Sequence, residues 1–213
     1  MGYDERYRKT EDYFGPGVAP LLRKYHHLIS KASPVLDIGA GQGRNTLFLA
    51  RNRFMVDAID PSQVAIDTID EIVAKERIPV RTYCCGWESF VPEADSYSGI
   101  LIFGLLQILS RESIDLLLQK VKAWTDKRSL VFVTAFTTAD SLYPERLQKW
   151  KKIGKTSFAD EDNNVATYLE LDEIPNLFGD FKVIHHWEGM SPKHRHGDEP
   201  PEQHGVVEAV FQR

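Results

Sequence analysis

Apolar and polar positions alternate in blocks along this chain. Short apolar runs typical of buried strands are separated by longer stretches in which apolar residues recur at helical spacing. Five such runs come first, at Pro34–Ile38, Phe54–Ile59, Val80–Cys84, Gly99–Phe103 and Leu130–Ala135. Two more, Phe181–Trp187 and Val206–Phe211, are joined by a polar stretch too long for a tight hairpin. This order predicts an α/β fold: a seven-stranded, mostly parallel sheet with one reversed strand and helices on both faces.

The helices are expected between these strands. After the second strand, one apolar stripe consists of Ala65, Ile69, Ile72 and Val73. After the fourth, Ser110 is expected to cap a helix that buries Ile114, Leu117, Leu118, Val121 and Trp124. Asp172–Phe178 predicts a short helix with Pro175 in its first turn. The segment Thr137–Asn164 is less regular and is expected over the carboxyl ends of the strands, where open α/β sheets bind ligands.

Composition narrows the class of protein. The chain has 213 residues, which suits one domain. Its formal net charge of -5 argues against binding to nucleic acid through the phosphates, and its one basic run, Lys149–Lys155, is short. No apolar run approaches the length of a membrane span, and the polar N-terminus does not resemble a signal peptide. Adjacent Cys84 and Cys85 seldom form a disulfide, so we expect a cytoplasmic protein.

The most informative stretch is Val35–Arg51, in which a strand turns through three glycines into a helix. Glycines let a ligand approach the main chain, and the helix N-terminus offers free N–H groups. A dinucleotide fingerprint would need glycine at 44, but Arg44 stands there, which disfavours a nicotinamide dehydrogenase. The spacing G-x-G-x-G suits S-adenosylmethionine, which has no pyrophosphate. Its ammonium needs an anionic neighbour, a role that Asp37 can fill directly or through water.

Asp60 is a second indication of a cofactor site, because it ends the second strand in the sequence VDAIDPS. A carboxylate at this point can accept hydrogen bonds from both ribose hydroxyls of a nucleoside. The alternative is a purely structural turn followed by a helix-capping aspartate. The turn, the acid at the strand end and the order of strands together favour the cofactor site.

The stretch VLDIGAGQGRN also resembles motif I of the class I S-adenosylmethionine-dependent methyltransferases, and the resemblance extends over nearly the whole chain. The segments DERYRKTEDYFG, GRNTLFLA and AFTTAD resemble the TehB-like branch, which includes tellurite and selenite methyltransferases. The resemblance implies the Rossmann-like class I fold. It also implies a cofactor set of Asp37, Gly39, Gly41, Arg44, Asn45, Asp60 and Pro61, with main-chain contacts from Phe103.

The chain departs from this family after the third strand. Such enzymes often carry an acid there that meets the adenine amino group, whereas Gly86 stands at the aligned position. Trp87 is expected either to pack on adenine or to lie at the edge of the core. The N-terminal aromatic residues form a lid over the cofactor or an amphipathic cover on the sheet. The resemblance favours a cover, with Tyr13 among the cofactor contacts and Gly15-Pro16-Gly17 as its joint.

These features divide a single domain, 1–213, into an N-terminal cover at 1–30, a cofactor-binding half at 31–136 and an acceptor-side half at 137–213. Phe103-Gly104-Leu105-Leu106 replaces the Asn-Pro-Pro-Tyr motif of enzymes that methylate nucleic-acid bases. We therefore predict methyl transfer from S-adenosylmethionine to a small-molecule acceptor. The alternative is a non-catalytic protein that binds S-adenosylmethionine or S-adenosylhomocysteine.

The acceptor is expected near the polar loop after the sixth strand. Glu188 followed by His194-Arg195 resembles a pattern in the tellurite enzymes, so His194 and Arg195 are the predicted catalytic residues: a base beside a cation that holds an anionic acceptor. A solvated connection is the second interpretation. A metal site formed by His194, His196 and His204 is the third, but its spacing matches no known zinc pattern, so no metal is expected.

Overall fold

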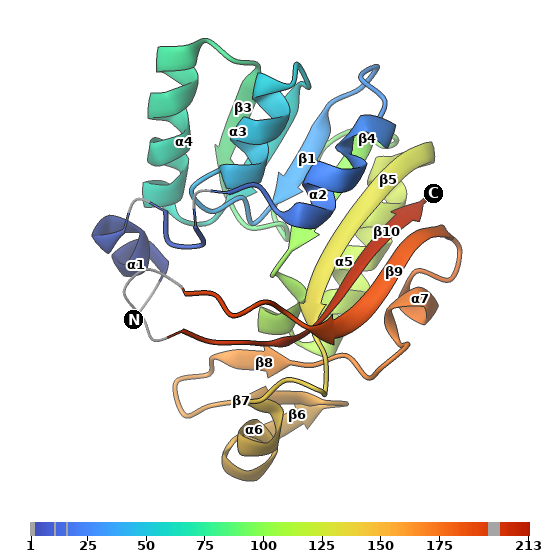
Figure 1. Cartoon of the computed structure of the whole chain (residues 1–213). Coiled ribbons are helices and arrows are strands. Elements are labelled where there is room, and N and C mark those ends of the chain that lie inside the picture. The colour runs from blue at the N-terminus through green and yellow to red at the C-terminus, as the bar shows by residue number, and fades with distance from the viewer. Residues whose placement is uncertain (1–2, 11, 16, 196–200) are drawn as a thin grey trace.

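The computed structural model describes residues 3–10, 12–15, 17–195 and 201–213. Its central sheet has seven strands in the order β3-β2-β1-β4-β5-β10-β9 (Figure 1). Neighbours pair in parallel from β3 to β5, whereas β10 is antiparallel to both β5 and β9. The predicted seven-stranded sheet with one reversed strand is confirmed. The strands are β1 (Val35–Ile38), β2 (Val56–Asp60), β3 (Val80–Cys84), β4 (Tyr97–Phe103), β5 (Thr125–Phe136), β9 (Lys182–Met190) and β10 (Gly205–Gln212).

Helices cover both faces of this sheet, as its continuous apolar strands require. Leu36 on β1 belongs to the core cluster that includes Leu117 of α5 (Arg111–Trp124). Its neighbour Val35 points the other way and joins Leu22 of α2 (Pro20–Tyr25) and Leu49 of α3 (Arg44–Arg51). α4 (Gln63–Glu76) packs beside α3, and α7 (Ile174–Leu177) beside α5. Strand alternation therefore distributes one sheet's side chains between two apolar cores.

The helix starts follow the polar residues that precede them. The Ser110 hydroxyl accepts a hydrogen bond from the backbone N–H of Ser113 at 3.1 Å, so the predicted cap of α5 is confirmed. Ser62 caps α4 in the same way, through the N–H of Ala65 at 3.2 Å. α7 is shorter than predicted and spans one turn. The chain also has α1 (Tyr3–Lys9) and two 3-10 turns, η1 (His26–Leu28) and η2 (Leu106–Ile108).

The segment after β5 is more regular than its sequence indicated. It contains α6 (Tyr143–Lys149) and a second, antiparallel sheet of β6 (Lys151–Gly154), β7 (Ser157–Ala159) and β8 (Val165–Thr167). Arg111 attaches this sheet to α5, because its guanidinium donates to the carbonyl oxygens of Lys155 at 2.7 Å and Tyr168 at 2.6 Å and pairs with Glu173 at 3.0 Å. Three-residue strands carry too little alternation for the sequence to reveal them.

None of the helices in the described part of the chain is both long enough and apolar enough to cross a membrane. Cys84 and Cys85 are both free thiols, as their adjacency predicts.

Candidate functional site

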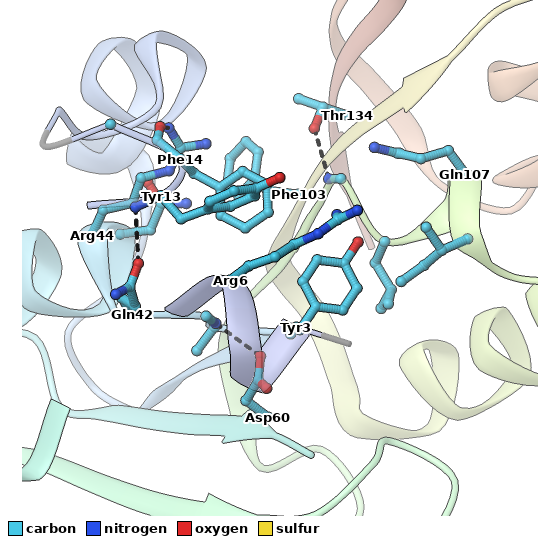
Figure 2. A pocket seen from close by; sticks show the side chains of 18 of the residues that line it. Tyr3, Arg6, Tyr13, Phe14, Gln42, Arg44, Asp60, Phe103, Gln107 and Thr134 are labelled. Atoms are coloured by element: carbon cyan, nitrogen blue, oxygen red, sulfur yellow. Dashed lines mark hydrogen bonds between the residues drawn. The ribbon is translucent and has the colours of Figure 1, made fainter. Parts of the chain in front are cut away.

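A cavity of about 820 Å³ opens at the carboxyl ends of β1, β2, β4 and β5 (Figure 2). Its floor is the glycine turn after β1, and Asp60, Phe103 and Thr134 come from the ends of the neighbouring strands. α1 and the segment that follows it form one wall, and the residues before β10 form another. The cavity thus lies where open α/β sheets bind their ligands, as predicted.

The floor of the cavity is a backbone turn that side chains would obstruct. Gly39, Gly41 and Gly43 have φ values of 71°, 54° and 86°, in the left-handed region. The N–H groups of Gly39 and Ala40 both donate to the carbonyl of Ile59, at 2.9 and 3.1 Å, which fixes the turn against β2. Gly43 then precedes α3, so the first free N–H groups of that helix face the same region.

Asp60 holds the turn from the side. One carboxylate oxygen accepts the N–H of Gly41 at 2.9 Å, and the other accepts the N–H of Ser62 at 2.8 Å. Burial raises the pKa of Asp60, and these two hydrogen bonds oppose that rise. Each carboxylate oxygen has further lone pairs, so the group can bind a ligand while it holds the turn.

Asp37 lies beneath the same turn, with 2% of its surface exposed. The hydroxyl of Thr46 donates to its carboxylate at 2.6 Å. Burial raises the pKa of Asp37 to about 6, against the opposing effects of Thr46 and the nearby charge of Arg44. A cation bound beside this carboxylate would favour its ionised form.

Side chains at the start of α3 bind the N-terminal segment. The Gln42 amide accepts the N–H of Tyr13 at 2.9 Å and donates to the carbonyl of Thr10 at 2.7 Å. Arg44 donates to the carbonyl of Phe14 at 2.6 Å, and Asn45 accepts the N–H of Ala19 at 3.0 Å. The turn and α3 therefore also bind the N-terminal segment that forms one wall of the cavity.

Two polar atoms in the cavity wall are buried with no hydrogen-bond partner among the described residues. They are Nε of Arg6 and Oε1 of Gln107. Figure 2 shows the Arg6 side chain extending into the pocket beside Tyr3, whose ring centroid lies 5.5 Å from the guanidinium carbon. Buried polar atoms without partners are uncommon, and a polar ligand would provide them with partners.

Opposite the turn, the wall before β10 carries His194, Glu202 and His204. The buried His204 ring is held by Asp140, whose carboxylate lies 2.8 Å from Nδ1. Asp140 also accepts the N–H groups of Leu142 at 2.8 Å and Gly205 at 3.1 Å. Burial lowers the pKa of His204, but the hydrogen bonds and charges of Asp140 and, to a smaller extent, Glu202 outweigh it, so the net pKa is raised.

Residues 35–128, which run from β1 into β5 and include the glycine turn and Asp60, match the family model described as a methyltransferase domain. The fold resembles that of an S-adenosylmethionine-dependent methyltransferase from Methanosarcina mazei, with a TM-score of 0.74, 17% identity and coverage of 92% of this chain and 98% of that one. Residues 35–128 thus match a methyltransferase domain, and the fold is that of the S-adenosylmethionine-dependent enzymes. The methyl donor of enzymes with this domain and fold is S-adenosylmethionine.

Two further solved structures resemble this fold. TehB from Haemophilus influenzae gives a TM-score of 0.71 at 18% identity, over 98% of this chain and 67% of that one, so the predicted likeness to TehB holds for the fold. The 1,6-didemethyltoxoflavin-N1-methyltransferase of Burkholderia thailandensis gives 0.70 at 15% identity, over 99% and 87%. In sequence, a 46-residue segment is 41% identical to hemagglutinin 1 of Eikenella corrodens; it spans 22% of this chain and only 15% of that protein.

Most residues predicted to bind the cofactor line the methyltransferase cavity together. They are Tyr13, Asp37, Gly39, Gly41, Arg44, Asn45, Asp60, Pro61 and Phe103. Gly86 and Trp87 are not among the described residues that line it. Trp87 lies in the core cluster under α5, and Lys120 sits 6.0 Å from its ring, which corresponds to the core-edge interpretation.

Only one of the two predicted catalytic residues lines the cavity. His194 lines the cavity, whereas its neighbour Arg195 is exposed and is not among the described residues that line it. Glu188 lies on β9 and contacts His186 at 3.0 Å instead of His194. His196 and the nearby Asp198 are outside the described residues.

Sequence reasoning missed several residues of this site. Gln42 lies inside the glycine motif, but nothing in its spacing shows that its amide would bind the backbone at 10 and 13. Asp140 follows β5 in the stretch AFTTAD and reaches a histidine 64 residues away. The only local signal for Asp140 was a carboxylate close to the end of a strand.

Proposed function

We propose that this methyltransferase transfers the methyl group of S-adenosylmethionine to a small-molecule acceptor. The observation that carries the proposal is one cavity with two different walls. The glycine turn, Asp37 and Asp60 lie on one side, and a set of imidazole and carboxylate groups lies on the other. Such a cavity suits two ligands that meet in the middle, and catalysis then depends mainly on their placement.

The cofactor side fits the groups of S-adenosylmethionine. Asp60 is positioned at a strand end to accept the ribose hydroxyls, and Asp37 provides the negative charge that the methionyl ammonium needs. The bound cofactor supplies an activated methyl group on a sulfonium. Arg6 offers a buried donor to an anionic group of either ligand.

A small acceptor is favoured by the size and enclosure of the cavity. A volume of about 820 Å³ lies within the range of small-molecule sites. The 1,6-didemethyltoxoflavin-N1-methyltransferase among the structural neighbours has 1,6-didemethyltoxoflavin and S-adenosylhomocysteine bound. We also propose that residues 1–30 cover the cofactor, since Tyr7 and Tyr13 of this segment are buried against α4 and line the cavity.

His194 is proposed to act on the acceptor side, where it lines the wall with Glu202 and His204. The transfer forms a bond from the acceptor to the methyl carbon as the carbon–sulfur bond breaks, and S-adenosylhomocysteine leaves. A coupled assay for S-adenosylhomocysteine release, over thiol, phenol, amine, selenite and tellurite acceptors, tests turnover. Release with none of them, while the cofactor binds normally, would favour the non-catalytic alternative.

Replacement of Asp60 tests the cofactor site directly. Asp60→Asn keeps the shape of the side chain but exchanges one acceptor oxygen for a donor, which opposes the N–H group of either Gly41 or Ser62 and weakens the ribose bonds. We expect affinity for S-adenosylhomocysteine to fall by tens-fold, or about 2–3 kcal/mol, in calorimetric titration.

Asp57→Asn is the matched control for this variant. Asp57 is a buried carboxylate on the same strand, but it is bound to Arg81 at 2.7 Å and Tyr97 at 2.8 Å, away from the cavity. This variant should lose stability and retain its affinity for the cofactor product. Equal affinity loss in both variants would show that a damaged β2, and not a lost ribose contact, explains the result.

The pKa of Asp37 predicts a dependence of cofactor affinity on pH. The methionyl ammonium favours the carboxylate form, and burial raises the pKa of Asp37 to about 6. Below pH 6 a proton therefore competes with the cofactor, and affinity for S-adenosylhomocysteine should fall by up to about tenfold per pH unit. Asp37→Asn should bind more weakly at neutral pH and lack this component between pH 5 and 7. A wild-type profile no steeper than that of Asp37→Asn would remove Asp37 from contact with the ammonium.

A further inference from the structure

The acceptor wall brings together three side chains that are separated by a loop in sequence. Ligand atoms of His194, Glu202 and His204 all lie within 4.8 Å of one another. Nε2 of His204 is 3.4 Å from a carboxylate oxygen of Glu202. All three residues line the cavity.

Backbone pairing determines this arrangement. The N–H of His194 donates to the carbonyl of Glu202 at 3.0 Å, and the N–H of Glu202 donates to the carbonyl of His194 at 2.8 Å. Residues paired in this way across two antiparallel segments project to the same side. His204 follows Glu202 by two positions in extended chain, so it shares that side as well. Figure 1 shows the segments after β9 and before β10 running together from the sheet toward α1.

Both histidines direct Nδ1 at an acceptor oxygen of the chain. Nδ1 of His194 lies 3.0 Å from the carbonyl oxygen of Pro192, and Nδ1 of His204 lies 2.8 Å from the Asp140 carboxylate. A carbonyl oxygen can only accept, and Asp140 already accepts two backbone N–H groups. A metal ion at either ring would therefore coordinate Nε2, and at His204 it would take the place of the contact that Nε2 makes with the Glu202 carboxylate.

We propose that His194, Glu202 and His204 bind one divalent transition-metal ion of the zinc type. Two imidazoles and one carboxylate form a recurrent ligand set for such ions, and they leave positions open for a water or a substrate. A ligand histidine whose other nitrogen donates to a carboxylate, as His204 does to Asp140, is the usual supporting arrangement. Bonds of about 2.1 Å require the ligand atoms to lie within about 4.2 Å of one another, so a small side-chain rotation completes the site.

The ion would select the class of acceptor, an inference that rests on the proposed function. Its open positions face the cavity and suit a small molecule with a hydroxyl or thiol group. On coordination that group loses its proton to solvent. Its lone pair then bonds to the methyl carbon as the carbon–sulfur bond breaks and S-adenosylhomocysteine leaves, and the ion is unchanged. This proposal differs from the expectation from sequence that no metal is bound.

Metal binding is tested on the full chain without cofactor. We expect Zn²⁺ to bind with a stoichiometry of one in calorimetry, and Co²⁺ to give a visible absorption band from the same site. His194→Ala, Glu202→Gln and His204→Ala should each weaken Zn²⁺ binding by at least about 100-fold, and Asp140→Asn by about tenfold. His194→Ala is the variant least disruptive to folding, because His194 is half-exposed and lies outside the central sheet.

His186→Ala is the matched control. A second cluster, with ligand atoms within 4.8 Å of one another, consists of His186, Asp172 and Glu188. Its Glu188 carboxylate already accepts the N–H of Asp172 at 3.1 Å. None of these three residues is among the described residues that line the cavity. His186→Ala should bind Zn²⁺ like the wild type. An absence of saturable binding, or binding lost in His186→Ala but kept in His194→Ala, would overturn the proposal. Titration of the same variants with S-adenosylhomocysteine tests the cofactor site separately.

Discussion

Gly205→Ala should destabilise this methyltransferase by about 3 kcal/mol. Gly205 begins β10, where the chain passes directly against the backbone that follows β5. A Cβ atom at this position would lie 2.5 Å from the carbonyl carbon of Ala139, and the amide nitrogen of Asp140 would be closer still. Both atoms belong to backbone, so no side-chain rotation can relieve the overlap.

The same contact supports the acceptor wall. The carbonyl of Gly205 accepts the N–H of Thr137 at 2.8 Å, and its own N–H donates to Asp140 at 3.1 Å. Separation of the two segments would lengthen both hydrogen bonds and displace Asp140 from His204. Gly205→Ala should therefore also disturb the wall formed by His194, Glu202 and His204 in the molecules that remain folded.

Urea unfolding, followed by circular dichroism, measures the free energy change. Gly17→Ala is the control, because a Cβ at position 17 would meet nothing within 4 Å. It should be neutral or slightly stabilising, as a glycine-to-alanine change restricts the unfolded chain. If the two alanine variants unfold at the same urea concentration, the backbone of Ala139 and Asp140 can move away from position 205 at little cost.

The features that could be predicted from sequence are those determined by neighbouring residues. Each strand of the large sheet was visible as an apolar run, since parallel strands are buried on both faces. The reversed strand was expected because a final pair of apolar runs follows the five parallel strands. The glycine turn and the two strand-end acids were also recognisable, because each lies within a few residues of the strand it follows.

The features that could not be predicted depend on residues far apart in the chain. His204 and Asp140 are separated by 64 positions and meet only because β10 pairs with β5. Trp87 stood beside an expected adenine contact, but apolar neighbours place it in the core under α5. Residue type restricted these side chains to two or three roles, and only tertiary packing distinguishes among those roles.

Gly41→Val should reduce affinity for S-adenosylhomocysteine by at least 100-fold, which is about 3 kcal/mol and more than Asp60→Asn. Gly41 lies at φ 54°, where a β-branched residue is strongly disfavoured. Its N–H is bound to Asp60 at 2.9 Å, so a change in the turn also moves the expected ribose acceptor. A Cβ here would stand 3.2 Å from the Tyr7 hydroxyl, in the space between the turn and the N-terminal wall that the cofactor has to enter.

Two further variants distinguish backbone strain at position 41 from loss of the space that the cofactor enters. Gly41→Ala adds a Cβ without branches and should bind with intermediate affinity. Gly179→Val lies outside the cavity, where a Cβ would meet only the carbonyl oxygen of Asn176 at 3.4 Å, and should bind like the wild type. Calorimetric titration gives each affinity, and circular dichroism establishes that the variants are folded. The second sheet and the acceptor wall lie outside this turn, so Gly41→Val should remain folded while it loses the cofactor. Normal binding by a folded Gly41→Val would mean that the glycine turn serves the fold alone, and the cofactor would have to approach the sheet at another point.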